Sequence, residues 1–441
     1  MKFETRTPTA GTAAATNEQA VDLGNKRISG LTTSQTASDR SKMEVALLTG
    51  GGDRPYAYGL STELLAKGIA LDIVGSDDLD FPELRGRPDA KFLNLRGSQN
   101  PNANFAKKSW RVLAYYFRLI RYTFRATPKV FHILWNNKFE TFDRTVLMAY
   151  YRLLRKRVVL TVHNVNARKR DSRDSFLNRV TLRIQYRLAD HLFVHSDRMK
   201  TDLVQEFGVP NERITTIPFG LNNAVPTTDL PADEARRRLE ITAREKVILF
   251  FGNIAPYKGL EYLVTAFQEF LPEDQGYRLV VAGRPKGFPE YWEKIQQGVD
   301  RGVRKNRILL RCEYIPDEET EVFFKAADVL VLPYKYIYQS GVLFLGYSFG
   351  LPVLAADVGS LREEIVEGKT GYVFKPEDPA DLARAIETYF RSDLYANLAA
   401  RRGEIREYAV ARYSWSIVGE RTRDIYAALL GLSPSVGWSH P

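Results

Sequence analysis

The chain has 441 residues, 44% hydrophobic and 26% charged, which is enough for two domains that each bury a hydrophobic core. Its single cysteine, Cys312, excludes an intramolecular disulfide and a cysteine-based metal site. The formal net charge of +10 is unevenly spread, because residues 101–200 hold 22 Lys and Arg against 6 Asp and Glu, so this region suits a negatively charged partner.

Residues 1–42 are rich in Thr, Ala, Ser and Gln and show no apolar period, which predicts a disordered leader. From Met43 onward, strand-like and helix-like segments alternate along the chain. Strands are predicted from the apolar runs at 43–52, 69–75, 129–135, 158–164, 191–196 and 213–219, and helices at 107–126, 141–155 and 175–188.

After Gly220, the stretch "LNNAVPTTDLPADE" carries the Pro, Asn and paired Thr of a linker. A second alternating series follows it. Its strands are predicted at 247–252, 277–283, 307–315, 328–334, 352–358 and 371–374. Apolar strands that alternate with helices form parallel sheets, so the predicted fold is α/β, with two Rossmann-like domains facing a cleft.

The predicted boundaries are residues 43–222 for the first domain, 223–412 for the second, and 413–433 for a final helix that crosses back to the first. The tail 434–441 contains "GWSHP", which looks like the start of a purification tag and is excluded from fold reasoning. No run of eighteen apolar residues and no signal-peptide pattern is present, so we expect a protein that neither spans a membrane nor is secreted.

The stretch "LFFGNIAPYKGLEYLVTAF" (249–267) predicts a strand, a turn and a helix that begins at Lys258-Gly259. It is not a Walker A loop, because lysine precedes glycine and no Ser or Thr follows. A lysine at a helix N-terminus favours a bound anion, although a solvated loop lysine is the alternative. Two further loop-to-helix starts, at Gln339-Ser340-Gly341 and Gly359-Ser360, favour a diphosphate site at one sheet edge.

Five segments, "FFGNIAPYKGLEYL", "AADVLVLPY", "QSGV", "FGLPVLAADVGSLREEIVEGKTGYVF" and "ADHLFVHS", together resemble the GT-B glycosyltransferases of family 4. The resemblance covers about residues 43–430. It implies retaining, metal-independent transfer of a sugar from a nucleoside-diphosphate sugar, with no cofactor, an acceptor-binding first domain and a donor-binding second domain. It assigns the donor diphosphate to Lys258. Further donor contacts are expected at Gly51, Gly52, Gly252, Asn253, Gln339, Ser340, Gly341 and Val342.

Two departures from the family pattern leave the donor open between a UDP-sugar and a GDP-sugar. Asn253 stands where the family usually has Arg. The glutamate pair of the family would fall at Ile337 and Leu345, neither of which is acidic. The contacts to the donor ribose and sugar are therefore not assigned.

"LTVHNVN" places His163 just past the end of a buried strand, where it matches the family histidine that touches the transferred sugar. A structural histidine is the alternative, and His195 at the end of the next strand is a second candidate. The resemblance implies front-face attack, in which the leaving phosphate deprotonates the acceptor hydroxyl while the enzyme orients the reactants.

In "KKSWRVLAYYFRLIRYTFR" (107–125), Trp110, Leu113, Phe117, Ile120 and Phe124 recur at helical spacing. Arg111, Arg118 and Arg125 repeat every seven residues beside them, and Arg179, Arg183 and Arg187 share one face of a later helix. Basic amphipathic helices with aromatic residues suit an anionic membrane surface, although the apolar face could instead pack inside the first domain. Nucleic acid is not an expected partner, because no helix-turn-helix, RNP or zinc-finger spacing is present.

We therefore expect a cytoplasmic enzyme, peripheral on the inner face of the cell membrane, with a lipid-linked saccharide acceptor, as in exopolysaccharide or glycolipid assembly. Two alternatives remain open. One is a soluble glycosyltransferase on a small or phosphorylated acceptor, and the other is a non-catalytic homologue that binds sugar nucleotides.

Overall fold

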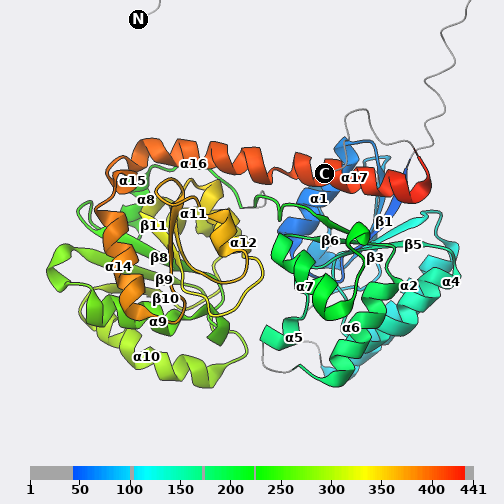
Figure 1. Ribbon diagram of the computed structural model, residues 1–441, viewed down its shortest axis with the longest axis horizontal. Helices are drawn as coiled ribbons and strands as arrows, with labels where there is room; N and C mark the ends of the chain where they lie inside the picture. Colours follow the sequence, from blue (N-terminus) through cyan, green and yellow to red (C-terminus); the bar gives the residue numbers. More distant parts are fainter. Residues whose placement is uncertain (1–42, 100–103, 171–173, 223–224, 433–441) are drawn as a thin grey trace, which may run out of the picture. The chain divides into compact units, whose positions relative to one another are not determined.

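The computed structural model describes residues 43–99, 104–170, 174–222 and 225–432 (Figure 1). The predicted leader at 1–42 and the predicted tail at 434–441 lie outside these described residues.

Within the described residues, the first sheet has seven parallel strands in the order β3-β2-β1-β4-β5-β6-β7. After β1 the chain adds β2 and β3 on one side, and it then adds β4 to β7 on the other side. The reversal point of this sheet therefore lies between β1 and β4. The strands are β1 (Glu44–Leu48), β2 (Ala70–Gly75), β3 (Ala90–Asn94), β4 (Val130–Ile133), β5 (Arg157–Thr161), β6 (His191–Val194) and β7 (Ile214–Thr216).

The second sheet is also parallel, with the order β10-β9-β8-β11-β12-β13 among the described residues. This is the strand order of a dinucleotide-binding Rossmann sheet, with the reversal between β8 and β11. The strands are β8 (Lys246–Phe251), β9 (Tyr277–Ala282), β10 (Ile308–Arg311), β11 (Val329–Leu332), β12 (Val353–Ala356) and β13 (Gly371–Phe374). The prediction of two Rossmann-like α/β domains is confirmed.

Helices connect the strands of both sheets (Figure 1). Those of the first series are α1 (Arg54–Ala66), α2 (Phe105–Arg125), α3 (Glu140–Phe142), α4 (Met148–Leu153), α5 (Ala167–Arg170), α6 (Phe176–Leu188) and α7 (Asp197–Phe207). Those of the second series and the C-terminal stretch are α8 (Ala232–Arg238), α9 (Leu260–Thr265), α10 (Pro289–Arg304), α11 (Asp317–Ala326), α12 (Gly341–Ser348), α13 (Leu361–Glu364), α14 (Pro379–Phe390), α15 (Asp393–Ala396), α16 (Leu398–Tyr413) and α17 (Trp415–Leu430).

Both faces of the first sheet are buried, as its apolar strands require. Along β1, Ala46 and Leu48 belong to the core on one face, while Val45 and Leu47 belong to the core on the other. This alternation follows from the two-residue period of a strand. The second sheet is enclosed in one larger core, which leaves the strand ends and their loops as the places for polar chemistry.

Several element boundaries differ from the predictions. The predicted strand at 213–219 stops at Thr216, because Pro218 has no N–H to donate to the ladder. The predicted helix start at Lys258 is wrong: residues 256–258 form a 3-10 turn, Gly259 is left-handed at φ 64°, and α9 begins at Leu260. The edge strand β3 was not predicted, because its side chains are exposed or only partly buried.

The C-terminal helix α17 packs beside α1, on the first sheet, after α16 has run along the second domain (Figure 1). The Tyr426 hydroxyl lies 2.5 Å from Nδ1 of His132 in β4, and Trp415 Nε1 donates to the Leu221 carbonyl at 2.7 Å. A second link joins the two halves of the chain. Tyr338 packs in the core of the first sheet and its hydroxyl donates to Asp202 Oδ2 at 3.0 Å.

No helix within the described ranges is both long enough and apolar enough to cross a membrane.

Four histidines of the first domain lie in surroundings that disfavour their charged form. Burial lowers the pKa of His132 to about 3, and lowers the pKa values of His191 and His195 to about 4. Burial also holds the pKa of His163 well below its usual value. Unfolding would expose all four to water, where their pKa values would be about 6.5.

We therefore predict that these histidines destabilise the folded protein as the pH falls from about 6.5 toward 4. The unfolded chain binds more protons in this window, so each histidine contributes a slope of up to about 1.4 kcal/mol per pH unit to the free energy of unfolding. Asp143 opposes this trend, because burial raises its pKa to about 6. Urea unfolding between pH 7 and 4.5 should show a shallower slope for His191→Gln than for the wild type. Identical slopes for the two proteins would contradict the prediction.

Candidate functional site

The reversal points of the two sheets predict where a ligand binds, because ligands of open parallel sheets sit at the carboxyl ends of the strands at such points. A cavity of about 370 Å³ lies there, lined by loops of both sheets. Its lining includes Asp53, Tyr56, Trp135, His163, Asn164, Phe219, Tyr257, Lys258, Ile337, Gln339, Ser340, Gly341, Val342, Leu345 and Trp415.

His163 follows β5 and forms one wall of the cavity. Its ring stacks on the Trp135 ring, with centroids 4.2 Å apart and planes 5° from parallel, and Tyr56 contacts it edge-on at 4.7 Å. This aromatic environment excludes water, which is the main reason for the depressed pKa of His163; nearby His195 lowers that pKa further. His163 is therefore neutral at physiological pH.

A chain of hydrogen bonds fixes which nitrogen of His163 carries the proton. His195 Nδ1 lies 3.3 Å from the Ile217 carbonyl oxygen, which can only accept, so this nitrogen holds the hydrogen of His195. Nε2 of the neutral His195 is then an acceptor, 3.1 Å from His163 Nδ1, which must donate. Nε2 of His163 is left as an acceptor, and it has no hydrogen-bond partner among the described residues.

Lys258 lies on the opposite wall, in the turn after β8, and its side chain is only 6% exposed. Its Nζ donates to the Tyr334 hydroxyl at 2.6 Å and sits 4.1 Å from the centre of the Tyr334 ring. The Tyr334 hydroxyl lies 3.3 Å from Ser340 Oγ. The structure thus holds a buried ammonium group at the cavity wall through a tyrosine that follows β11.

The predicted segment at 339–342 lines the same cavity, at the N-terminus of α12. Gln339 is positioned by Ser360, whose hydroxyl lies within hydrogen-bonding distance of Gln339 Oε1 and of the Tyr338 carbonyl. Backbone N–H groups of the first helical turn lack intrahelical partners, so this end of α12 offers donors to an anion.

Ile337 and Leu345, the positions of the family's glutamate pair, also line the cavity and are nearly buried. Asp53 is the only carboxylate among the described lining residues. Its Oδ1 already accepts from the Tyr56 backbone N–H at 3.2 Å, as the N-cap of α1. The cavity wall around Ile337 and Leu345 is therefore apolar where the family pattern is acidic.

Four of the predicted donor-binding residues do not line the cavity. Gly51 and Gly52 lie in the loop after β1, and Gly252 and Asn253 in the loop after β8. A Cβ on Gly52 would come within 2.0 Å of the Trp135 ring, so this glycine is what lets Trp135 reach His163. A Cβ on Gly252 would lie 3.6 Å from Val342, which does line the cavity.

The predicted membrane-facing residues lie elsewhere, on α2 and α6. Trp110, Phe117 and Phe124 are 70–72% exposed. The domain core instead receives the opposite face of α2, through Tyr115, Tyr116 and Leu119.

The arginines beside this apolar face make mostly local contacts. Arg111 donates to the Ser98 carbonyl and Arg118 to the Leu95 carbonyl, while Arg125 is exposed. On α6, Arg179 pairs with Asp174, and Arg183 donates to the Glu206 carbonyl.

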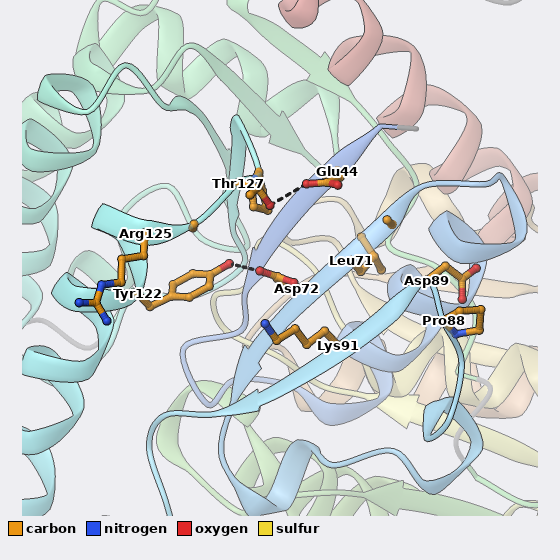
Figure 2. A pocket seen from close by; sticks show the side chains of 12 residues that line it. Glu44, Leu71, Asp72, Pro88, Asp89, Lys91, Tyr122, Arg125 and Thr127 are labelled. Atoms are coloured by element: carbon orange, nitrogen blue, oxygen red, sulfur yellow. Dashed lines mark hydrogen bonds between the residues drawn. The ribbon is translucent and has the colours of Figure 1, made fainter. Parts of the chain in front are cut away.

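A cavity of about 410 Å³ lies at the opposite edge of the first sheet (Figure 2). Four of its polar groups are paired with each other: Tyr122 donates to Asp72 at 2.7 Å, and Thr127 donates to Glu44 at 2.8 Å. Because it opens at the amino ends of β1 and β2, it does not share the position expected of a ligand site in this fold.

No group of three or more His, Cys, Asp or Glu side chains that could hold a metal ion occurs in the part of the chain that the structure describes.

His163, Lys258 and the 339–342 segment were predicted from the sequence and line this cavity, whereas its aromatic residues were not predicted. Tyr56, Trp135, Phe219, Tyr257 and Trp415 line the cavity, and Tyr334 holds Lys258 at its wall. None of them gives a periodic signal that separates it from core residues. Trp135 and Tyr334 are the last residues of the strands predicted at 129–135 and 328–334, so their position at a strand's carboxyl end was an available signal.

Two family models match the chain, one for each sheet. Residues 50–224 match the model described as Glycosyltransferase Family 4, and residues 245–392 match the model described as Glycosyl transferases group 1.

Among curated proteins, a D-inositol 3-phosphate glycosyltransferase of Corynebacterium efficiens is 25% identical over 397 residues, covering 86% of this chain and 90% of that protein. A protein of the same name from Acidothermus cellulolyticus is 31% identical over 249 residues, which cover 54% of this chain and 53% of the relative.

Solved structures share the fold. A sucrose-phosphate synthase from Thermosynechococcus elongatus superposes with a TM-score of 0.70 at 20% identity, covering 89% of this chain and all of that one. The Anabaena protein HepE in complex with UDP-glucose superposes with a TM-score of 0.67 at 17% identity, covering 88% of this chain and 99% of that one. With both sheets, their reversal points and both family models in agreement, the chain belongs to the family 4 glycosyltransferases with the GT-B fold.

Proposed function

We propose that this glycosyltransferase moves a sugar from a nucleoside-diphosphate sugar to a lipid-linked saccharide at an anionic membrane surface, with retention and without a metal ion. The observation that carries the choice of acceptor is the exposed apolar face of α2. Trp110, Phe117 and Phe124 lie on it in two-turn steps and are each at least 70% exposed. Monomeric proteins rarely expose such a patch without a partner.

Lys258 supplies the charge that the departing nucleoside diphosphate needs. Its ammonium group is nearly buried, and a charge in such a site interacts more strongly than one in water. Tyr334 holds the ammonium from one side, and the N-terminus of α12 offers N–H donors across the same cavity. A UDP-sugar is the favoured donor, because the similar HepE structure contains UDP-glucose.

His163 orients the transferred sugar. Its unprotonated Nε2 can accept a hydrogen bond from a sugar hydroxyl. The hydrogen bond to His195 keeps the ring proton of His163 on Nδ1. Retention then requires front-face attack, in which the leaving phosphate oxygen takes the proton of the acceptor hydroxyl. The protein contributes orientation and charge stabilisation to this step.

The membrane-facing part of the proposal combines apolar and basic side chains. The apolar residues of α2 stand beside Arg118, Arg121 and Arg125, all of them exposed. Aromatic residues enter the boundary between lipid headgroups and acyl chains, and arginines attract anionic lipid. The protein would then be peripheral on the cytoplasmic face of the membrane.

A second candidate is transfer to a small soluble acceptor that carries a phosphate. The names of the curated relatives favour it, because they specify inositol 3-phosphate as the acceptor. The two candidates share the donor site and differ in whether the enzyme works at a membrane.

We predict that Lys258→Ala lowers kcat by about a hundredfold to a thousandfold, the usual cost of losing one group that stabilises charge in a transition state. Lys258→Arg, which keeps the charge, should be less impaired. Lys375→Ala, at an exposed lysine of the same domain, should match the wild type. Steady-state assays in excess EDTA measure these effects and test the metal-independent proposal, since the wild type should remain active there. A change of less than threefold in Lys258→Ala would refute the role of the lysine.

We predict that His195→Phe lowers kcat/KM about tenfold, equal to ~1.4 kcal/mol, because His163 Nδ1 loses its acceptor and the proton is no longer confined to that nitrogen. His195→Gln, whose amide oxygen can accept the same hydrogen bond, should restore part of the activity. Side-chain ¹⁵N chemical shifts report the tautomer directly, and the chain contains only five histidines to assign. An unchanged His163 tautomer in His195→Phe would disprove the positioning role.

We predict that changing Trp110, Phe117 and Phe124 together to Ser weakens binding to anionic vesicles by at least about a hundredfold, because each buried aromatic is worth about 1.5–3 kcal/mol. A matched control changes three exposed apolar residues of the second domain, Phe270, Tyr314 and Val410, to Ser. Vesicle flotation should separate the two triple variants. Equal flotation of both variants and the wild type would favour the small-acceptor candidate.

A further inference from the structure

A second group of basic side chains lies at the carboxyl edge of the first sheet, outside the cavity that holds His163 and Lys258. Arg96 follows β3, Arg111 belongs to the first half of α2, and Lys138 lies in the loop after β4. All three line one small, shallow surface pocket of about 20 Å³, together with Gln99, Val112, Tyr115, Tyr116 and Asn137. No carboxylate lines this pocket among the described residues, so its charge is uniformly positive.

Arg96 is the most constrained of the three cations. Its guanidinium lies over the Tyr115 ring, 5.7 Å from the ring centre. Its Nη1 atom is buried and has no hydrogen-bond partner among the described residues, and no ion pair of Arg96 occurs among them. A buried guanidinium nitrogen without a partner is costly, so the position calls for an acceptor that none of the described residues provides.

The neutral polar groups of the pocket wall are already engaged. The Tyr115 hydroxyl donates to Asn137 Oδ1 at 2.7 Å. Behind the wall, Asp143 accepts from the Tyr116 hydroxyl at 2.9 Å and from the Asn137 backbone N–H at 2.5 Å. These bonds fix the shape of the pocket and leave the three cations as the groups that can receive a ligand.

The pocket adjoins the loop that supports the transfer site. A Cβ on Gly51 would come within 1.8 Å of Arg96 Nη1, so the guanidinium packs directly on the backbone of that loop. The neighbouring residue Gly52 touches Trp135, which stacks on His163. One short loop therefore separates Arg96 from the aromatic wall of the reaction cavity. A ligand bound by Arg96 would lie on the acceptor side of the site.

We propose that Arg96, Arg111 and Lys138 form a subsite for a phosphate or diphosphate group carried by the acceptor. A planar guanidinium matches the oxygens of a phosphate in bidentate fashion, and three cations suit a multiply charged anion better than a single carboxylate. Arg111 directly follows Trp110 of the exposed apolar face of α2, so a phosphate held here could link a saccharide in the cavity to a lipid in the membrane. The inference rests on the proposed transfer to an acceptor, and both candidate acceptors can carry this group.

The test measures binding of pyrophosphate by titration calorimetry, with UDP and GDP in excess so that the donor site is occupied. We expect Arg96→Met to bind pyrophosphate at least tenfold more weakly than the wild type, and Arg96→Lys to be intermediate. Arg155→Met removes the same charge from an exposed position of the first domain that does not line the pocket, and it should bind like the wild type. Unchanged urea unfolding of Arg96→Met establishes that the variant is folded.

A second arm identifies the source of the phosphate. Flotation is compared for neutral phosphatidylcholine vesicles with and without a polyprenyl phosphate. A gain with the polyprenyl phosphate that Arg96→Met abolishes supports a lipid-borne group, and Arg96 dependence with pyrophosphate alone supports a soluble phosphorylated acceptor. If neither probe binds in an Arg96-dependent way, the subsite is refuted. No sugar transfer is measured in either arm, so a failure of the proposed reaction would be seen separately, in the kinetic assays.

Discussion

In a parallel sheet all strands end at the same edge, and this constraint decides where the polar side chains of the protein can meet. His163 follows β5 and Lys258 follows β8, nearly a hundred residues later, yet both line one cavity. The backbone N–H and C=O groups within the strands are hydrogen-bonded to neighbouring strands. The loops at the strand ends are therefore the parts of the fold whose chemistry can vary. The aromatic residues then remove water from this edge, which keeps His163 neutral and strengthens the field of Lys258.

Much of the fold could be predicted from the sequence because buried parallel strands are continuous apolar runs that recur at regular intervals. The site residues that the sequence identified share a different property: each stands in a short loop with unusual chemistry, such as the Lys-Gly after a proline turn or the Gln-Ser-Gly before α12. The helix start predicted at Lys258 is misplaced for a physical reason. Periodicity cannot distinguish the last residues of a 3-10 turn from the first turn of an α-helix, and here a left-handed Gly259 separates the two.

Other features could not be predicted, because they depend on which side of an element faces the core. Helix α2 carries large apolar residues on two faces, and sequence alone does not say that Tyr115 and Leu119 point inward while Trp110 and Phe117 face solvent. Arg96 is a single arginine after an edge strand, which carries no pattern at all. Its significance arises only when folding places its guanidinium against Gly51 and leaves a buried nitrogen without an acceptor among the described residues.

The placement of Tyr338 has a thermodynamic consequence. By sequence it belongs to the second half of the chain, but its ring packs in the core of the first sheet and its hydroxyl bonds Asp202. The next two residues, Gln339 and Ser340, line the cavity that also holds His163 and Lys258. Suppose that a nucleotide binds this segment more tightly when Tyr338 is packed in the core of the first sheet. Bound nucleotide must then favour the packed position of Tyr338 by the same factor by which packing increases the affinity for the nucleotide. Occupancy of this cavity by a nucleotide and the packing of Tyr338 in the core of the first sheet are thereby linked by a single coupling free energy.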